Sequence, residues 1–514
     1  MANKFICFVF SLFLCLLGTS GTAQSPVGHC GTGTDMETFS AMRSRALAHL
    51  ARPHTARERD DETIYIPVKY HLYGRDDGSS AADFSDILEL HLRLNEEYAE
   101  HDIQFYINGG LDIVANTDYY ENPGEHINHQ QQIFSNNSVN VYIGNSADID
   151  TDNGAGLTLG YYFPTYDWIV MRKSEAKYNA ETLAHEMGHF FSLNHTFFGW
   201  ECIAWQDWLS ENPGAECAPT TAPCFDIPVE AADGSNCETA ADFLCDTPAD
   251  YRFTSANCVY ADAACDPDGE PLMPLTDNIM SYFFGCEDQT FTEQQADMLM
   301  TDINAPTRNY LRTDGGPDKV TAPSAAPDPA YPAEAEELPN YNVTVGWRPV
   351  QHATYYVVQR GANSAFTIFD RQYVTRDTFL TMSDLSPEFR YYWRVTPFNE
   401  YQTALQWSES RTFVTGTEFI NPGAPLQNHL LEVTPNLIQR GREMQINVTA
   451  KENFTSRIEI YATDGRMVQQ TEEREFSEGE NNFSLYPTRL QSGLYIVVLR
   501  DGSEVQTQKI VLFE

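Results

Sequence analysis

The sequence predicts a multidomain protein: an α/β domain with an irregular, cysteine-rich lower subdomain, followed by two all-β sandwich domains. Strand and helix patterns alternate from residue 61 to about residue 191. Eight cysteines then lie between Cys202 and Cys286, among many Gly and Pro residues. Short alternating strands fill 341–416 and 429–514, and each stretch has the size of a sandwich domain.

The composition limits the classes of partner. The chain has 514 residues, with 32 Lys and Arg against 73 Asp and Glu, so its formal net charge is −41. Such a charge repels phosphate backbones, so no nucleic-acid partner is expected. Hydrophobic residues make up 42% of the chain and aromatic residues 12%, which is enough to form packed cores and excludes wholesale disorder.

The first 23 residues have the pattern of a secretory signal peptide. Lys4 precedes a short apolar run at 5–17, and small residues at 18–23 offer a cleavage site before Gln24. The run is too short for a membrane span, and no later stretch of 18 apolar residues exists. We therefore expect a protein that is secreted or held at the cell surface, with 1–23 removed and no membrane span.

The cysteine pattern predicts disulfides. Eight of the nine cysteines that follow the signal peptide lie between Cys202 and Cys286, and none forms a C-x-x-C pair. In an exported protein this predicts four disulfides in a loop-rich region, with the pairing left open because eight cysteines can pair in many ways. The alternative, a zinc ribbon, requires close cysteine pairs. The ninth cysteine, Cys30, stands alone near the mature N-terminus.

The α/β part is expected to extend over 61–314, after a polar, arginine-bearing segment at 24–60. Alternating apolar residues predict four strands, which are 66–73, 103–107, 139–143 and 168–171. Helical spacing predicts two helices, which are 84–98 and about 180–191. A segment rich in Pro, Ala and acidic residues at 315–340 predicts an extended linker.

The most informative segment is ETLAHEMGHFFSLNHTF at 181–197. His185 and His189 are four residues apart and therefore share one helix face, the spacing at which two imidazoles bind one metal ion. Glu186 follows the first histidine, where its carboxylate can reach a water on that metal. The alternative is a surface helix with two unrelated histidines.

His195 can become a third ligand only if the chain turns sharply after Phe191, because a continued helix would carry it to the far side. The usual pattern, H-E-x-x-H-x-x-G-x-x-H, has glycine at this turn, where the present sequence has Ser192. We therefore predict a left-handed backbone at Ser192, at a cost of about 1 kcal/mol.

Together with the segment DNIMSY at 277–282, these histidines resemble the metzincin metallopeptidases. By that resemblance Met280 lies under the metal-binding histidines, and Tyr282 points toward the metal or the oxyanion. The alternative for Met280 is an ordinary core methionine. Within the metzincins the chain resembles the pappalysin family, on HEMGHFFSLNHTF, CDTPAD at 245–250, NIMSY and FTEQQADMLM at 291–300.

The resemblance implies a zinc endopeptidase that cleaves extracellular proteins or peptides. Its zinc ligands would be His185, His189 and His195. Glu186 would take a proton from the attacking water and return it to the leaving amine, while Tyr282 would stabilise the oxyanion. The alternatives are a non-catalytic binding protein on a metzincin scaffold and a hydrolase of non-peptide substrates.

The resemblance implies three further features. Calcium would stabilise the lower subdomain, with Asp246 and Thr247 as candidate contacts; the alternative is a plain turn. His-Cys-Gly-Thr around Cys30 resembles the start of pappalysin-type prosegments, in which the cysteine occupies the fourth zinc position as a zymogen switch; the alternative is a free or intermolecular thiol. Removal of the prosegment, 24–60, would activate the enzyme. An extended substrate is expected along an edge strand near 168–171.

The two C-terminal stretches resemble known modules. Residues 341–416 resemble a fibronectin type III domain, with Trp347 in an early strand and Tyr391 placed as a tyrosine corner. Either a spacer or a binding module fits that resemblance. Residues 429–514 resemble the C-terminal sorting domain of type IX secretion substrates, on VTPN, IEIYATDGRMV, LQSGLYIVVL and the final QKIVLFE. This implies the type IX secretion machinery as a partner; the alternative is a second adhesive sandwich.

Overall fold

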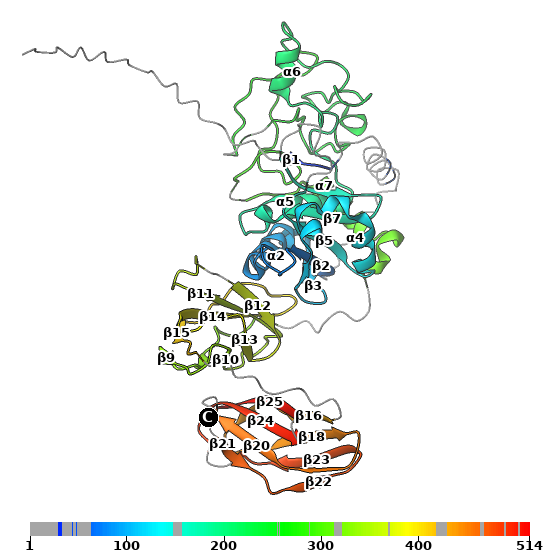
Figure 1. Ribbon diagram of the computed structural model, residues 1–514. Helices are drawn as coiled ribbons and strands as arrows, with labels where there is room; N and C mark the ends of the chain where they lie inside the picture. The colour runs from blue at the N-terminus through cyan, green and yellow to red at the C-terminus, as the bar shows by residue number, and fades with distance from the viewer. Residues whose placement is uncertain are drawn as a thin grey trace, which may run out of the picture.

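The computed structural model comprises an α/β domain, a loop-rich region and two β-sandwiches (Figure 1). It describes residues 29–32, 44, 48, 63–147, 157–253, 255, 258–286, 288–312, 321–368, 371–417, 429–462, 467–487, 490–501 and 504–513. The expected signal peptide, 1–23, lies outside these residues, and so does most of the expected prosegment. None of the described helices is long and apolar enough to cross a membrane.

A mixed sheet with the order β1-β6-β7-β5-β2-β3 organises the α/β domain, and β4 also pairs with β2. Its strands are β1 (His29–Cys30), β2 (Ile64–Gly74), β3 (Ile103–Ile107), β4 (Asp112–Ala115), β5 (Val139–Gly144), β6 (Thr158–Phe163) and β7 (Trp168–Arg172). The strands from β7 to β3 are parallel, whereas β6 is antiparallel to β7. All four strands predicted for this domain are present.

Two helices pack on the sheet and match the predicted ones: α2 (Phe84–Tyr98) and α5 (Thr182–Phe190). The hydroxyl of Tyr98 donates to the carbonyl of Ala184 at 3.0 Å, so α2 and α5 are joined directly. The other helices are α3 (Thr117–Glu121), α4 (Ile127–Ile133), α6 (Trp205–Glu211) and α7 (Glu293–Ile303). Short 3₁₀ turns are η1 (Ala99–His101), η2 (Pro123–Glu125), η3 (Lys173–Glu175), η4 (Cys237–Thr239) and η5 (Pro306–Leu311).

The prediction of an edge strand near 168–171 is wrong. β7 lies inside the sheet, between β6 and β5, and all its residues but the last are buried. The strand beyond it is β6, which the sequence analysis did not predict because its two tyrosines and a glycine break the alternation. The edge of β6 is covered by β1, which runs parallel to it and pairs Cys30 with Gly160.

The lower subdomain is loop-rich and held by disulfides, as predicted. The four bridges are Cys202–Cys224, Cys217–Cys265, Cys237–Cys245 and Cys258–Cys286. The zinc-ribbon alternative is therefore wrong, because all eight cysteines of this region are oxidised. Cys30 is free and buried.

The first sandwich packs a three-stranded sheet, β13-β10-β8, against a five-stranded sheet, β12-β11-β14-β15-β9. Its strands are β8 (Pro329–Tyr331), β9 (Glu336–Glu337), β10 (Val343–Trp347), β11 (Tyr355–Gly361), β12 (Arg371–Thr375), β13 (Phe379–Met382), β14 (Arg390–Phe398) and β15 (Arg411–Val414). Trp347 and Tyr391 lie in its core with Trp393 and Val395. The hydroxyl of Tyr391 accepts the backbone N–H of Ser386 at 2.8 Å, as a tyrosine corner does.

The expected linker at 315–340 is only partly a linker. β8 pairs with β10, and β9 pairs with β15. Both short strands fall within the Pro- and Ala-rich segment, and the composition that predicted extended chain also suits sheet edges, where missing N–H groups are tolerated. The sandwich therefore begins before residue 341.

The first sandwich covers the free edge of the α/β sheet. The backbone N–H of Ile107, on β3, donates to the carbonyl of Glu400 at 2.8 Å. Beside this bond the ring of Tyr401 packs edge-on against Tyr65, with ring centroids 5.4 Å apart. An uncovered edge strand is a template for pairing with other chains. This sandwich therefore packs directly on the edge of the α/β domain.

The last sandwich packs β16-β18-β23 against β17-β25-β24-β20-β21, with β19 and β22 paired beside them. Its strands are β16 (His429–Thr434), β17 (Leu437–Gln439), β18 (Met444–Ala450), β19 (Phe454–Ser456), β20 (Ile458–Ala462), β21 (Met467–Gln470), β22 (Arg474–Phe476), β23 (Gly479–Leu485), β24 (Gly493–Asp501) and β25 (Glu504–Phe513). Two C-terminal all-β domains were predicted, and two are present.

Tyr401→Ala is expected to loosen the first sandwich from β3. Tyr401 is 5% exposed, and removal of a large buried ring costs about 3 kcal/mol. Hydrogen exchange of the β3 amides should therefore accelerate. Tyr486→Ala, at a side chain that is 52% exposed, is the matched control and should leave exchange at β3 unchanged. Equal protection in both variants would contradict the docking described above.

Candidate metal centre

The helix α5, which carries His185 and His189, ends in a left-handed turn. His185 and His189 share the inner face of α5, and the helix stops at Phe190. Ser192 then has φ = 74°, as predicted, and the N–H of Leu193 donates back to the carbonyl of Gly188 at 2.9 Å. The backbone reverses at this point, which brings His195 back toward the helix.

Four buried side chains converge where the helix and the turn meet. The ligand atoms of Cys30, His185, His189 and His195 all lie within 4.8 Å of one another. The Nε2 atoms of His189 and His195 are 3.1 Å apart. Elsewhere in the described chain, no three such side chains come as close. The three predicted metal ligands and the predicted switch cysteine therefore occupy one centre.

The outer nitrogens of the first two histidines are held by the backbone. Nδ1 of His185 lies 2.7 Å from the carbonyl of Ile279, and Nδ1 of His189 lies 2.8 Å from the carbonyl of Leu193. A carbonyl only accepts, so each Nδ1 carries the proton and each Nε2 presents a lone pair to the centre. Nε2 of His185 is buried and has no hydrogen-bond partner among the described residues. Burial lowers the pKa of His185 to about 4. Neutral imidazoles in this arrangement suit a metal cation.

Met280 lies directly against the helix that carries the histidines. Its side chain is fully buried, and a Cβ added at Gly188 would lie 2.4 Å from its sulfur. Its carbonyl accepts the N–H of Thr196, the residue after His195, at 3.2 Å. Its own N–H donates to the side chain of Asn278 at 2.9 Å. Met280 therefore supports both the helix and the returning chain.

Glu186 and Tyr282 lie at the same centre. Glu186 is completely buried, and burial raises its pKa to about 7. Tyr282 packs against His195, with ring centroids 5.3 Å apart. Its hydroxyl donates to the carbonyl of Cys30 and accepts the N–H of the same residue, both at 3.0 Å. Burial also raises the pKa of the Tyr282 phenol well above its usual value.

The residues that follow Cys30 also engage the centre, and the sequence analysis assigned them no role. The hydroxyl of Thr32 donates to Glu186 Oε2 at 2.9 Å, and it accepts the N–H of Tyr162, on β6, at 2.6 Å. Burial raises the pKa of the Cys30 thiol, and nearby Glu186 adds to this rise. The segment that carries Cys30 thus contacts the metal ligands, the carboxylate and the sheet edge together.

A cavity of about 270 Å³ opens beside this centre. Its lining includes Glu186 and Tyr282 as well as the charged residues Glu175, Lys177 and Glu181. A group bound at Glu186 therefore has room beside it, where carboxylates and one ammonium group line the cavity.

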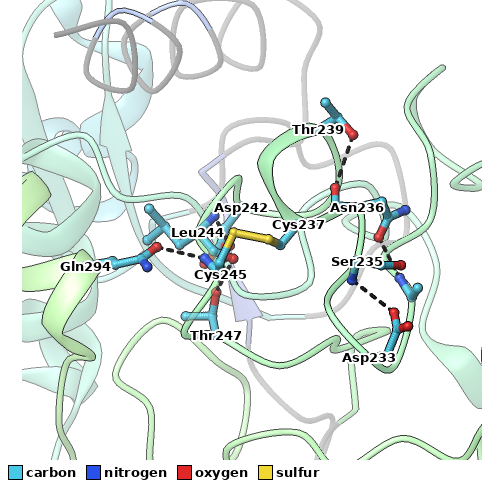
Figure 2. Close-up of a disulfide and its surroundings, with 11 residues drawn as sticks. Asp233, Ser235, Asn236, Cys237, Thr239, Asp242, Leu244, Cys245, Thr247 and Gln294 are labelled. Atoms are coloured by element: carbon cyan, nitrogen blue, oxygen red, sulfur yellow. Dashed lines mark hydrogen bonds between the residues drawn. A yellow bond between two sulfur atoms is a disulfide. The ribbon is translucent and has the colours of Figure 1, made fainter. Parts of the chain in front are cut away.

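The two predicted calcium contacts, Asp246 and Thr247, both make hydrogen bonds within the protein, and calcium binding stays a prediction. Asp246 accepts the Thr292 hydroxyl at 2.8 Å and the N–H of Gln294 at 2.7 Å, so both its oxygens are used at the start of α7. The hydroxyl of Thr247 donates to Asp242 at 2.9 Å, beside the Cys237–Cys245 disulfide (Figure 2). These contacts join the disulfide loop to α7 and supply the structural role of the CDTPAD segment.

The sequence analysis also missed Glu201. Its carboxylate is buried 3.6 Å from His195 Nδ1. Burial raises the pKa of Glu201 to about 8, and the charge of Arg252 acts against this rise. An acidic residue within the apolar run FFGWECIAW is the signal that could have found it.

Comparisons with known proteins agree with this centre and with the sorting domain. Residues 442–513 match the family of secretion system C-terminal sorting domains. An extracellular metalloprotease of Colletotrichum graminicola is 28% identical over 245 residues, which are 41% of this chain and 83% of that relative. An extracellular metalloprotease of Pyricularia oryzae is 27% identical over 240 residues, which are 42% and 81% of the two chains. This similarity and the buried histidine–cysteine cluster imply a bound metal ion.

The sorting domain directs the protein through type IX secretion to the cell surface or the exterior. Among solved structures, the chicken CNTN1 FN1–FN3 domains are 13% identical and cover 38% of this chain and 66% of their own, with a TM-score of 0.16. The fn3 domain of human collagen alpha-1(XX) chain is 21% identical and covers 22% of this chain and 99% of its own, with a TM-score of 0.14. The strand pairing within each domain defines the two sandwiches.

Gly188→Ala is expected to destabilise the protein, although alanine stabilises a helix by about 1 kcal/mol relative to glycine. The new methyl group overlaps the Met280 sulfur, and overpacking of this kind costs about 1–3 kcal/mol. Met280→Ala removes the obstacle, so Gly188→Ala should cost less in that background. Urea unfolding of both single variants and the double variant measures the coupling, and strictly additive effects would contradict the contact.

Proposed function

We propose that the protein is a secreted zinc endopeptidase of the metzincin type, similar to the pappalysins. The observation that carries the proposal is the convergence of His185, His189 and His195 beside Glu186, with each histidine held on a separate backbone contact or charged neighbour. Two relatives named extracellular metalloproteases support the same class. Three imidazoles with a neighbouring carboxylate are the usual donor set of a catalytic zinc.

The three histidines would hold the ion, and zinc would supply the acidity and the polarising charge that peptide hydrolysis needs. Glu186 accepts the proton of the attacking water. As the C–N bond breaks, the same carboxyl group returns that proton to the leaving amine. The Tyr282 phenol, released from the Cys30 backbone, donates a hydrogen bond to the oxyanion.

We infer that the segment around Cys30 keeps the enzyme latent. Its sulfur lies among the three histidines, where it would keep water from a bound metal ion. The Thr32 hydroxyl holds Glu186 Oε2, and the Cys30 backbone holds the Tyr282 hydroxyl. Each catalytic group is thus occupied by a different atom of one short segment.

The same segment indicates how substrate binds. β1 pairs with β6 at the edge of the sheet, so its removal exposes an unpaired edge next to Glu186. An extended peptide can pair with that edge and place one carbonyl at the metal, with a neighbouring side chain in the cavity beside Glu181.

Digestion of a mixed peptide library by the protein lacking 24–60 tests the activity. The protein with Glu186 intact should cleave. Glu186→Gln should lower the rate by roughly 10²- to 10⁴-fold, the range expected when a general base is lost. Glu211→Gln, at an exposed position on α6, is the control and should retain full activity. Chelation of the metal should abolish cleavage, and zinc should restore it. Absence of cleavage by folded, zinc-loaded protein would favour a binding protein or a hydrolase of other substrates.

Latency is tested with Cys30→Ala, Thr32→Val and the double variant in the full chain. Both single variants should raise the basal rate, and the double variant should exceed both, because the sulfur and the hydroxyl block different groups. The rate on a peptide chosen from the library is the measurement. All variants should cleave the peptide at the same rate once residues 24–60 are removed, because both substitutions lie in that segment. If the double variant matched Cys30→Ala, Thr32 would have no part in latency.

A further inference from the structure

The third histidine differs from the other two in what faces its outer nitrogen. Nδ1 of His185 and Nδ1 of His189 each lie against a neutral backbone carbonyl. Nδ1 of His195 instead faces Glu201 Oε1 at 3.6 Å. Both side chains of this pair are almost fully buried, with 2% and 3% exposure. Of the three histidines, His195 is therefore the one whose Nδ1 faces an ionisable side chain, Glu201.

The Glu201 carboxylate is only half used by the rest of the protein. Oε2 accepts the N–H of Gly199 at 2.7 Å. Oε1 is buried and has no hydrogen-bond partner within the described part of the chain. A buried acceptor without a donor costs about 1–3 kcal/mol, so its persistence here calls for a function.

The loop that carries Glu201 is fixed on several sides. The carbonyl of Glu201 accepts Nη1 of Arg252 at 2.8 Å. The next residue, Cys202, is bridged to Cys224, whose N–H donates to the carbonyl of Gly199 at 3.1 Å. A Cβ added at Gly199 would lie 2.8 Å from the Ala222 Cβ, so the loop backbone is pressed against its neighbour. The carboxylate is therefore held in one place.

The ring of His195 is also held in place by a neighbouring side chain. It stacks on Phe197 with ring centroids 4.4 Å apart and an angle of 12° between the planes. Rotation of the ring within this stack moves Nδ1 and Nε2 together. An acceptor behind Nδ1 thus determines where Nε2 points.

We propose that Glu201 is a positioning residue of the metal centre: its carboxylate accepts the Nδ1 proton of His195 and directs Nε2 to the metal. The proposal rests on the zinc function proposed above. A contraction of the 3.6 Å separation by less than 1 Å gives a charge-assisted hydrogen bond. Such outer carboxylates orient an imidazole ligand and increase its basicity.

Zinc affinity of Glu201→Gln tests the proposal. The full chain carries Cys30→Ala, so that the sulfur adds no ligand, and zinc is titrated against a chromogenic chelator. Glutamine keeps the size and the contact with Gly199 but loses the charge, and the Kd for zinc should rise about 10- to 100-fold. Glu211→Gln in the same background is the matched control and should change the Kd less than twofold. The visible spectrum of the cobalt-loaded protein should also shift in Glu201→Gln alone.

The outcomes separate the two proposals. If the parent protein does not bind zinc, the metal function itself is wrong. If the parent binds zinc and Glu201→Gln binds it equally with an unchanged cobalt spectrum, Glu201 has no positioning role. If Glu201→Gln folds poorly, Glu201→Asp restores a carboxylate, and its zinc affinity must recover toward that of the parent. Failure to recover in a folded Glu201→Asp protein also overturns the proposal.

Discussion

The left-handed turn at Ser192 is the constraint on which the metal centre depends. Without it His195 would continue along α5 and face away from the two histidines on the helix. Several contacts hold the turn: the Leu193 N–H closes onto Gly188, and Met280 packs on Gly188 and binds the backbone beyond His195. A serine with φ = 74° carries a backbone cost that these contacts offset.

The features set by local spacing could be predicted from the sequence. The helix over 84–98 and the strand over 103–107 follow from apolar periodicity, and the structure has both with the same bounds. The histidine spacing, with Ser192 at the usual glycine position, likewise predicted the left-handed turn that the structure has. These are short-range relations, in which the chain itself supplies the geometry.

The features set by long-range packing could not be predicted. β6 lacks an alternating pattern of apolar residues. Its position between β7 and β1 depends on contacts with residues that lie far away in the sequence. Disulfide pairing and the contact between Thr32 and Glu186, which are 154 residues apart, depend on the assembled fold. Glu201 belongs to the same class, since its proximity to His195 arises only when His195 has turned toward it. The hydrogen bonds of Asp246 to the start of α7 are likewise long-range contacts that the CDTPAD motif does not reveal.

The two edges of the α/β sheet have different covers, and this difference selects what the proposed enzyme can digest. The β3 edge is closed by a sandwich of the same chain, whereas among the described residues the β6 edge is closed by the short strand β1. A site reached by backbone pairing admits a segment only when that segment has no pairing of its own. Selection would then act on conformation before it acts on side chains, so loops and unfolded stretches would be cleaved and paired strands would resist. The sandwiches of the chain itself, whose strands are already paired, would be protected on the same principle.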